Sequence, residues 1–216
     1  MVDVTLVRTL RDQTGAGIMD CKQALENSGG DIEKAAQALR EKGVASATKR
    51  VGRETNEGVI ETYLHTGGRV GAMVELGCET DFVARTDQFQ EFVKDLAMQV
   101  AAANPICVSR ENISDQDLAR EREVYKAQAR ETGKPENVLD KIVEGKIGKF
   151  YRDVVLMEQA FIKDSDQDIQ TLVNAKIAEL GEKISIRRFT RYHVGEGLDR
   201  EEKDLSQEVK ELIANV

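Results

Sequence analysis

The feature that most constrains the fold is a pair of alternating segments joined by a glycine-rich turn. Residues 59–65 alternate between apolar and polar side chains, and residues 70–76 alternate again, with Val74 and Leu76 in the apolar phase. A period of two places the apolar side chains on one face of a β-strand. The TGGR sequence at 66–69 supplies two glycines that tolerate positive φ. The sequence therefore predicts an antiparallel β-hairpin with one buried face.

An acidic and aromatic segment follows this hairpin. Gly77 is expected to end the second strand, so that Asp81 and Phe82 lie on the connection to the next helix. Connections held between rigid elements often carry function. Two interpretations fit the pair. Either Asp81 caps the helix and Phe82 is buried in the core, or both side chains project as a wedge, the acid acting on a cation and the ring filling an apolar pocket of a partner.

The first fifty residues have helical periodicity, with apolar side chains recurring every three or four residues in three stripes. Residues 14–17 and 28–30 separate the stripes, and Asp31 is expected to cap the third helix, with Glu33 favourable in its first turn. The pattern predicts a small three-helix module, followed by a polar linker at residues 43–57. The stripes are Val4, Val7 and Leu10, then Ile18, Cys21 and Leu25, then Ile32, Ala35, Ala36 and Leu39.

Three helices are expected in the middle of the chain. Asp87 and Gln90 have the spacing of a capping box, and the helix that they begin is expected to end before Asn104. Residues 114–131 and 138–157 are also predicted to be helical. These two segments form either a helical hairpin or an interface with a second copy of the chain.

The last part of the chain returns to a strand. A helix is expected to start at Asp166 or Asp168, and residues 184–194 follow it as a strand. The apolar phase of this strand changes near Arg187 and Arg188, which indicates a β-bulge. An amphipathic helix closes the sequence, with the apolar side chains Leu205, Val209, Leu212 and Ile213.

These segments predict an α+β fold in three parts. Residues 1–53 form the three-helix module and its linker, residues 54–196 form an antiparallel sheet core with helices and a helical hairpin, and residues 197–216 form a C-terminal helical module. A hydrophobic content of 40% over 216 residues is enough for a core.

Charge narrows the class of partner. The chain carries 31 Lys and Arg residues against 39 Asp and Glu residues, a formal net charge of −8. A nucleic-acid-coating surface needs a net basic face, so proteins are the expected partners. No apolar run approaches the roughly 20 residues that cross a bilayer, and the N-terminus is too charged for a signal peptide. We therefore expect a cytoplasmic protein with no membrane partner.

No motif predicts a metal, nucleotide or nucleophile site. The glycines at 15 and 17 follow a helical segment and lack the third glycine of a dinucleotide loop. His65 and His193 lack ligand spacing. The basic cluster of Arg187, Arg188 and Arg191 is expected to be a solvated strand face that pairs with nearby acids. We expect no cofactor.

The cysteines are three in number and widely spaced, at Cys21, Cys78 and Cys107. An odd number excludes a full set of intramolecular disulfides, and no CxxC pair offers a metal site. We expect buried, reduced thiols, with one disulfide across a symmetric dimer as the alternative.

Three segments together resemble the bacterial translation elongation factor Ts family. Residues 14–25 (TGAGIMDCKQAL), with GDI at 30–32, are similar to its amino-terminal signature. ETDFV at 79–83 is similar to its second signature, and FTRYHVGEG at 189–197 resembles the stretch before its last helix. The matches follow the family's order over nearly the whole chain. A single Gly-Gly hairpin before TDFV resembles the short form of the family, with one core lobe.

The resemblance implies a guanine-nucleotide exchange factor for elongation factor Tu, with an N-terminal ubiquitin-associated-like module and a C-terminal docking helix. Such a factor makes and breaks no bond, so it is not an enzyme. Asp81 and Phe82, flanked by Thr80 and Val83, would enter the GTPase domain near its Mg²⁺ and phosphates and displace the ion. Other partner-binding residues that the family implies are Arg8, Arg11, Ile18, Met19, Leu205, Val209 and Leu212. For Ile18 and Met19, burial in the module core is the alternative.

Two other classes of function remain open from the residues. One is an adaptor in which only the three-helix module binds a partner, and the other is a small metabolic enzyme with a dispersed site. Within the resemblance, a short member could recreate the second lobe by pairing with itself through the sheet or residues 138–162. The sequence therefore predicts a homodimer that binds two partner molecules.

Overall fold

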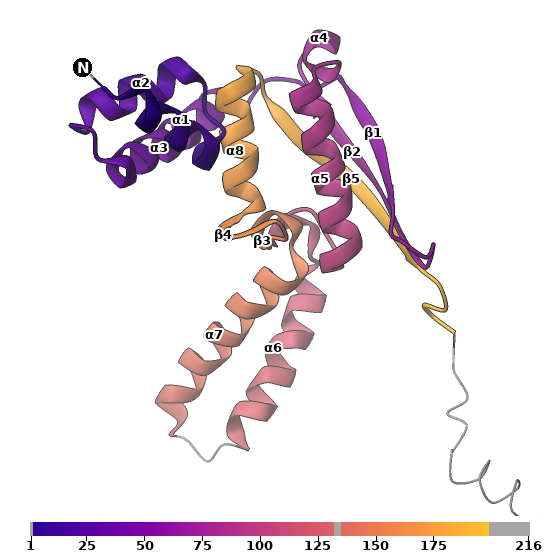
Figure 1. The fold of residues 1–216 in the computed structure, drawn as a ribbon. Coiled ribbons are helices and arrows are strands. Elements are labelled where there is room, and N and C mark those ends of the chain that lie inside the picture. Colours follow the sequence, from indigo (N-terminus) through magenta and orange to yellow (C-terminus); the bar gives the residue numbers. More distant parts are fainter. Residues whose placement is uncertain (1, 132–134, 199–216) are drawn as a thin grey trace, which may run out of the picture.

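The computed structural model describes residues 2–131 and 135–198 of the chain (Figure 1). Its fold is α+β, as predicted: a helical module and a long helical hairpin flank a core that contains a three-stranded sheet. The last predicted helix lies outside the described residues, and with it Leu205, Val209, Leu212 and Ile213. The part boundaries at 53/54 and 196/197 remain predictions.

The central sheet consists of three antiparallel strands in the order β1, β2, β5. Strands β1 (Glu57–Leu64) and β2 (Val70–Cys78) form the predicted hairpin, and β5 (Ile184–His193) pairs with the other edge of β2. Gly67 and Gly68 adopt φ values of 90° and 68° in the turn. Residues other than glycine rarely adopt these φ values, so the two glycines determine the hairpin turn.

Strand β2 continues beyond the position at which we expected it to end. Gly77 pairs with Gly58, and Cys78 pairs with Glu57, so the prediction that Gly77 ends the strand is wrong. The glycine serves close packing instead, because a Cβ atom there would lie 3.1 Å from the side chain of Thr55. The segment before β1 can therefore pass close to the sheet.

Strand β5 contains the predicted β-bulge. Glu75 pairs with Arg188 while Leu76 pairs with Ile186, so Arg187 is the inserted residue. The insertion shifts the side-chain phase by one. Apolar side chains on both sides of the bulge therefore pack on the same covered face of the sheet.

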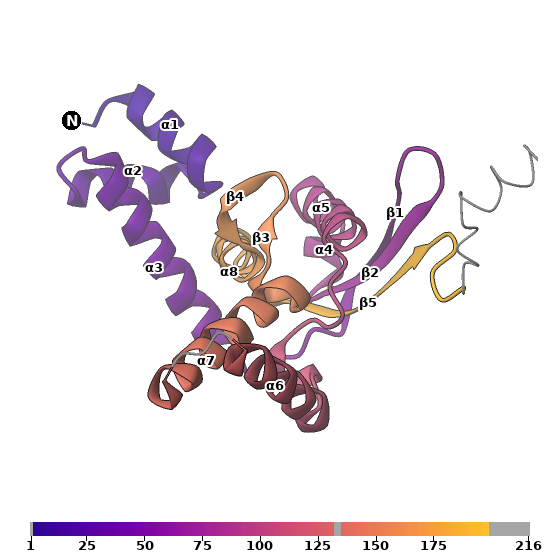
Figure 2. The same ribbon diagram turned by 90° about the horizontal axis from the view of Figure 1, so that it is seen from below.

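Helices cover one face of this sheet (Figure 2). The single-turn helix α4 (Asp81–Ala84) leads into α5 (Asp87–Ala103), which packs on β1 and β2, and α8 (Ile169–Leu180) lies beside α5. Asp168 caps α8, which confirms one of the two predicted starts. The fully buried side chains of this core include Val74, Leu76, Cys78, Phe89, Val93, Leu96, Val100, Leu156 and Ile169.

The start of α5 differs from the prediction. Thr86 is the N-cap, and its hydroxyl accepts a hydrogen bond from Phe89 N at 3.3 Å. The predicted capping box of Asp87 and Gln90 is therefore wrong, and Gln90 instead donates to a carbonyl oxygen of α4. The predicted end is confirmed, because Asn104 adopts a left-handed conformation with a φ of 48°.

The N-terminal module consists of α1 (Val4–Thr14), α2 (Ile18–Asn27) and α3 (Ile32–Arg50), as predicted. Asp31 caps α3 by accepting a hydrogen bond from Lys34 N at 3.1 Å. The helices share a small separate core of Leu10, Cys21, Ala24, Leu25 and Ala35.

The expected linker is wrong for its first half, because α3 continues to Arg50. The extension packs against α8 (Figure 1). Gly43 is buried there, and a Cβ atom at this position would lie 3.4 Å from the carbonyl oxygen of Asn174. This part of α3 packs through small residues, Gly43 and Ala47. It therefore lacks the stripe of large apolar side chains that indicates a buried helix in a sequence.

Helices α6 (Asp115–Arg130) and α7 (Glu136–Val154) form the predicted helical hairpin, which projects from the core (Figure 1). Short 3-10 helices at Arg110–Asn112 and Leu156–Glu158 flank the pair. The hairpin has its own buried cluster of Ala129, Leu139, Val143 and Ile147.

A second, two-stranded sheet was not predicted. Strands β3 (Ala160–Phe161) and β4 (Asp164–Asp168) are short, and β4 has none of the apolar alternation that marks a strand. Buried Gln99 holds this sheet against α5. Its amide nitrogen donates to Gln159 Oε1 at 3.2 Å, and its oxygen accepts from Ile162 N at 2.9 Å.

The docking of α3 on α8 predicts the effect of a large side chain at Gly43. Gly43→Leu should lower the free energy of unfolding by about 1–3 kcal/mol, because the added atoms meet the α8 backbone. Ala45→Leu is the matched control on the exposed side of the same helix, with an expected change within about 0.5 kcal/mol. Urea unfolding followed by circular dichroism measures both. Equal effects would contradict this docking.

Candidate functional site

The TDFV segment, residues 80–83, forms a single exposed turn at one end of the sheet (Figure 1). Thr80 is extended, with φ −130° and ψ 153°, and it caps α4 by accepting a hydrogen bond from Val83 N at 3.4 Å. The predicted alternative, in which Asp81 is the cap, is wrong, because Asp81 is the first residue of the helix. The Asp81 side chain therefore does not cap the helix.

Phe82 is the most exposed aromatic side chain among the described residues, with 80% of its surface accessible. The adjacent Val83 and Ala84 instead pack against the main core. The alternative in which Phe82 is buried is therefore wrong. A large apolar side chain held in this position is removed from water only when another molecule covers it.

Asp81 is also accessible. Its carboxylate lies 2.9 Å from the guanidinium of Arg85, one turn along, and 45% of the Asp81 side chain is exposed. Exposed ion pairs of this kind contribute little, typically about 0.2–1 kcal/mol. The carboxylate can therefore exchange Arg85 for another cation at low cost.

Two carboxylates hold the base of the turn. Glu182, on the connection between α8 and β5, accepts hydrogen bonds from Glu79 N at 3.1 Å, Thr80 N at 3.0 Å and Thr80 Oγ1 at 2.7 Å. Glu79 accepts in return from Lys183 N at 2.6 Å and from Arg53 Nη1 at 3.0 Å. We call this reciprocal arrangement of Glu79, Thr80, Glu182 and Lys183 the carboxylate clamp.

The pKa of Glu79 is lowered, mainly by the backbone N–H of Lys183; burial opposes this shift, and Arg53 adds to the lowering. Both partners donate hydrogen bonds that stabilise the ionised form. The carboxylate is therefore ionised at neutral pH, as the clamp requires.

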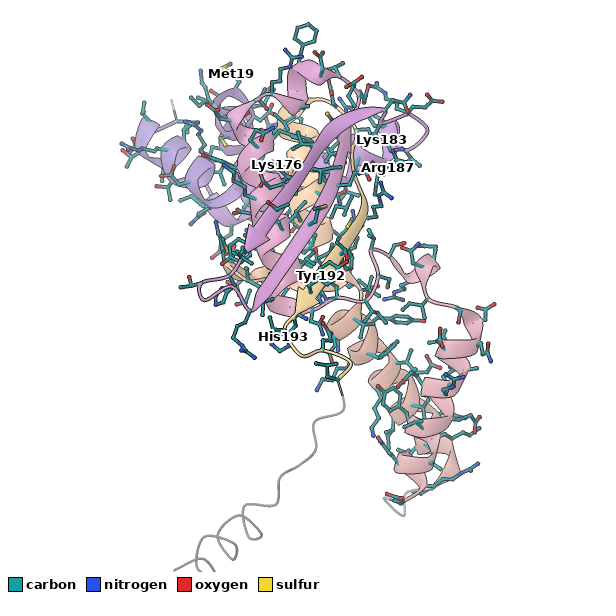
Figure 3. The ribbon with its side chains drawn as sticks, turned by 90° about the vertical axis from the view of Figure 1, so that its right-hand side faces the viewer. Met19, Lys176, Lys183, Arg187, Tyr192 and His193 are labelled. Atoms are coloured by element: carbon teal, nitrogen blue, oxygen red, sulfur yellow. The ribbon has the colours of Figure 1, made fainter. Side chains whose placement is uncertain are left out.

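The clamp extends to the end of the N-terminal module. Lys183 Nζ donates to the carbonyl oxygens of Val51 at 2.6 Å and Arg53 at 2.7 Å. Arg50 Nε donates to Gly181 O at 3.0 Å. Figure 3 shows Lys183 near the end of the molecule that carries α4. The carboxyl end of α3, the TDFV turn and the α8–β5 connection therefore meet at one place.

Cys78 lies directly below the turn. Its buried thiol donates to Thr80 O at 3.1 Å, and burial, followed by the charge of Glu182, raises its pKa to about 11. A protonated thiol is a poor nucleophile. Cys21 and Cys107 are also free and buried, as predicted.

The three-helix module presents a second surface. Ile18 and Met19 at the start of α2 are 57% and 72% exposed, so their predicted alternative of core packing is wrong. Arg8 and Arg11 on α1 are exposed as well. Met19 lies toward the same end of the molecule as α4 (Figure 3), but α8 stands between the two surfaces (Figure 1). A partner that touches both must therefore span α8.

The open face of the main sheet carries a third exposed surface, which we call the outer sheet face. The register places Ile60, Leu64, Met73 and Tyr192 on this face, and each is 44–73% exposed. Figure 2 shows no described helix over it. Exposed apolar side chains that form one surface indicate an interface.

The remaining candidates have structural or surface roles. Arg187 and Arg188 both pair with Glu75, at 3.3 Å and 2.6 Å, as the solvated-face prediction requires. The prediction is wrong for Arg191, whose side chain is only 16% exposed and donates to Ala101 O of α5 at 3.0 Å. Tyr63 OH lies 3.2 Å from His65 Nδ1, and His193 is exposed. Within residues 2–131 and 135–198, no group of His, Cys, Asp and Glu side chains is arranged to hold a metal ion.

Sequence reasoning missed the residues that hold the turn. Glu182 contacts Thr80 across 102 positions of the chain, and Arg53 contacts Glu79 across 26. Single charged residues in a chain with 32% charged content carry no local signal. Of the described helices, none has the length and apolar content needed to cross a bilayer.

Comparison with known proteins gives the family. A sequence model described as Elongation factor TS matches residues 18–196. The chain is 52% identical over 208 residues to an elongation factor Ts from Geotalea daltonii, with 96% of each chain covered. It is 55% identical over 203 residues to that of Geobacter metallireducens, covering 94% of each, and 52% identical over 212 residues to that of Desulforamulus reducens, covering 98% of each. The chain therefore belongs to the elongation factor Ts family of translation elongation factors.

Proposed function

We propose that this protein is the cytoplasmic guanine-nucleotide exchange factor for elongation factor Tu. It binds the GDP-loaded GTPase domain and promotes GDP release through Asp81 and Phe82. The observation that carries the proposal is the 80% exposure of Phe82 on a turn that is held by the carboxylate clamp. The proposed partner is a protein, with no direct contact to nucleic acid or membrane.

An exchange factor needs no bond chemistry of its own. It must bind the nucleotide-free partner more tightly than the nucleotide-loaded one, and linkage then requires that it weaken nucleotide binding by the same factor. Burial of a Phe side chain supplies about 1.5–3 kcal/mol. If the ring is buried only when the partner's nucleotide site is open, its burial accelerates GDP release by about tenfold for each 1.4 kcal/mol.

Asp81 has a separate role in the proposal. Its exposed carboxylate approaches the partner's Mg²⁺ or the ligands that hold the ion, and displaces them. A carboxylate is a strong ligand for Mg²⁺ and also competes for the basic groups around phosphates. The ion belongs to the partner, and this chain uses no cofactor.

The module surface has a different task. Arg8, Arg11, Ile18 and Met19 lie apart from the turn and bind the partner's nucleotide domain in both nucleotide states. Contacts that are equal in both states raise affinity without changing the maximal exchange rate. The C-terminal residues Leu205, Val209 and Leu212 are proposed to dock on the partner as well.

Substitutions in the turn test the proposal. Phe82→Ala should lower the saturating rate of GDP release by about 30-fold, equivalent to about 2 kcal/mol. Asp81→Ala should lower this rate as well. Fluorescent GDP preloaded on elongation factor Tu reports the rate. Ile106→Ala is the matched control, since Ile106 is 63% exposed and lies beyond the opposite end of α5.

The same assay distinguishes the rival classes. Met19→Ala should raise the concentration needed for half-maximal exchange and leave the saturating rate unchanged. Unchanged exchange by well-folded Phe82→Ala, with a loss only in Met19→Ala, would support the adaptor instead. Absence of acceleration by the wild-type protein would overturn the exchange function.

We further propose that the protein is a homodimer that binds two partner molecules, paired through the outer sheet face. The support is the exposure of Ile60, Leu64, Met73 and Tyr192 together on an uncovered sheet. The alternative region at 138–162 already buries Leu139, Val143 and Ile147 in the hairpin cluster and Leu156 in the main core, and Ile162 is its one large apolar side chain that is exposed, at 40%. It therefore offers less apolar surface to a second copy.

Light scattering tests this assembly. The wild-type protein should have twice the mass of one chain, and Leu64→Lys should shift it to the monomer because a charge is costly in an apolar interface. Val124→Lys on α6, where Val124 is 45% exposed, should leave the dimer intact. A concentration-independent monomer mass for the wild type contradicts the dimer, and dissociation by Val124→Lys alone favours the hairpin interface.

A further inference from the structure

We infer that Glu182 is a positioning residue for nucleotide exchange: its carboxylate sets the direction in which Asp81 and Phe82 project. The inference rests on the proposed exchange function and deepens it. Glu182 touches neither the partner nor the nucleotide in this account. It acts through the backbone and the hydroxyl group of the turn.

The first step is the fixing of the backbone before α4. Glu79 N and Thr80 N both donate to the same oxygen of Glu182, at 3.1 Å and 3.0 Å. Two consecutive amides bound to one oxygen fix the peptide plane between them. An ionised acceptor makes these bonds stronger than bonds between neutral groups. The point at which the chain leaves β2 is therefore set by a side chain outside the turn.

The second step is the capping of α4. Thr80 Oγ1 donates its proton to the other Glu182 oxygen at 2.7 Å. Its lone pairs are then available to accept from Val83 N at 3.4 Å. Glu182 thus selects the Thr80 rotamer that starts the helix. A helix of one turn is unstable without such support, because nucleation costs more than one hydrogen bond returns.

The third step is the fixing of Glu182 itself. The next residue, Lys183, donates its backbone N–H to Glu79 at 2.6 Å and its side chain to the carbonyl oxygens of Val51 and Arg53. Residues 79–80 and residues 182–183 therefore hold each other in place. Because Lys183 also binds the segment that follows α3, the direction of Phe82 is set relative to the end of the module helix.

Packing of Val83 and Ala84 is the competing explanation for the position of the turn. Both contact the main core and anchor one side of α4. Packing on one side restrains the depth of the helix, whereas the clamp restrains the chain entering it. The two explanations predict different results when Glu182 is removed and the core stays intact. If packing alone positions the turn, the turn keeps its position; if the clamp positions it, the turn is released.

Glu182→Ala, Glu182→Gln and the double variant Glu182→Ala/Phe82→Ala test the inference in the GDP-release assay. Glu182→Ala should lower kcat/KM for exchange by about tenfold, the size expected for loss of hydrogen bonds to a charged group. Glu182→Gln should recover most of the rate, because its single oxygen can still accept from both backbone amides. With Phe82 already removed, the loss of Glu182 should lower the rate by clearly less than tenfold, because only Asp81 remains to be positioned.

Glu158→Ala is the matched control. Glu158, like Glu182, is a partly exposed carboxylate with a hydrogen-bonded partner, in this case the guanidinium of Arg110. It lies near the start of α8, where Ile169 N donates to Gln159 O, whereas the clamp lies past the end of α8. We expect wild-type exchange from this variant. Loss of exchange there equal to that of Glu182→Ala would overturn a specific role for Glu182.

A second readout needs no partner. The Cys78 thiol donates to Thr80 O beneath the turn, so its alkylation by iodoacetamide reports opening of the clamp. Cys78 should react at least about tenfold faster in Glu182→Ala than in Glu182→Gln. Both variants remove the carboxylate charge that raises the pKa of Cys78, so the difference between them reports opening of the clamp. Cys21 and Cys107, both buried elsewhere, should keep their wild-type rates and so show that the fold is intact.

The outcomes are distinguishable. Equal Cys78 alkylation in Glu182→Ala and Glu182→Gln, or a double variant whose losses simply multiply, overturns the positioning role while leaving the exchange function in place. A wild-type protein that does not accelerate GDP release overturns the exchange function, and this inference with it. The alkylation rates, measured without partner, then show separately whether Glu182 holds the turn.

Discussion

The presentation of the TDFV turn depends on the exchange of hydrogen bonds between two carboxylates and two backbone segments. Glu182 binds residues 79 and 80, and Glu79 binds the amide of Lys183. An isolated helical turn with an exposed phenylalanine is unstable in water. The clamp supplies bonds that the turn cannot make for itself. It also joins the turn to the end of α3, so the proposed contact surfaces are carried on a single connected framework.

Elements with strong periodicity were predictable from the sequence. The hairpin, the three-helix module and the bulge at Arg187 follow from apolar spacing and glycine, which are local properties. The second half of α3 was missed because it packs through Gly43 and Ala47, which contribute no apolar stripe. Strand β4 was missed because its DSDQD sequence resembles a loop. It pairs instead with β3, and buried Gln99 holds β3 and the following turn through Ala160 O and Ile162 N.

The projecting residues of the candidate site could be predicted from the sequence, but the residue that holds them could not. Phe82 and Asp81 stand out as unusual residues at a strand end, and resemblance to the family suggested their use. Their exposure is a property of the folded chain: Val83 and Ala84 pack on the core, while Phe82 between Asp81 and Val83 is exposed. Glu182 could not be found from the sequence, since its partners lie more than 100 positions away and nothing local marks one glutamate among many.

The most direct test of the central claim is the affinity of this protein for elongation factor Tu, measured with and without saturating GDP. If Phe82 and Asp81 occupy a state of the partner that excludes the nucleotide, GDP must weaken the complex by the same factor by which the protein weakens GDP binding. The account predicts a dissociation constant at least about tenfold higher with GDP, and a much smaller difference for Phe82→Ala. Equal affinities of the wild-type protein in the two conditions would contradict it.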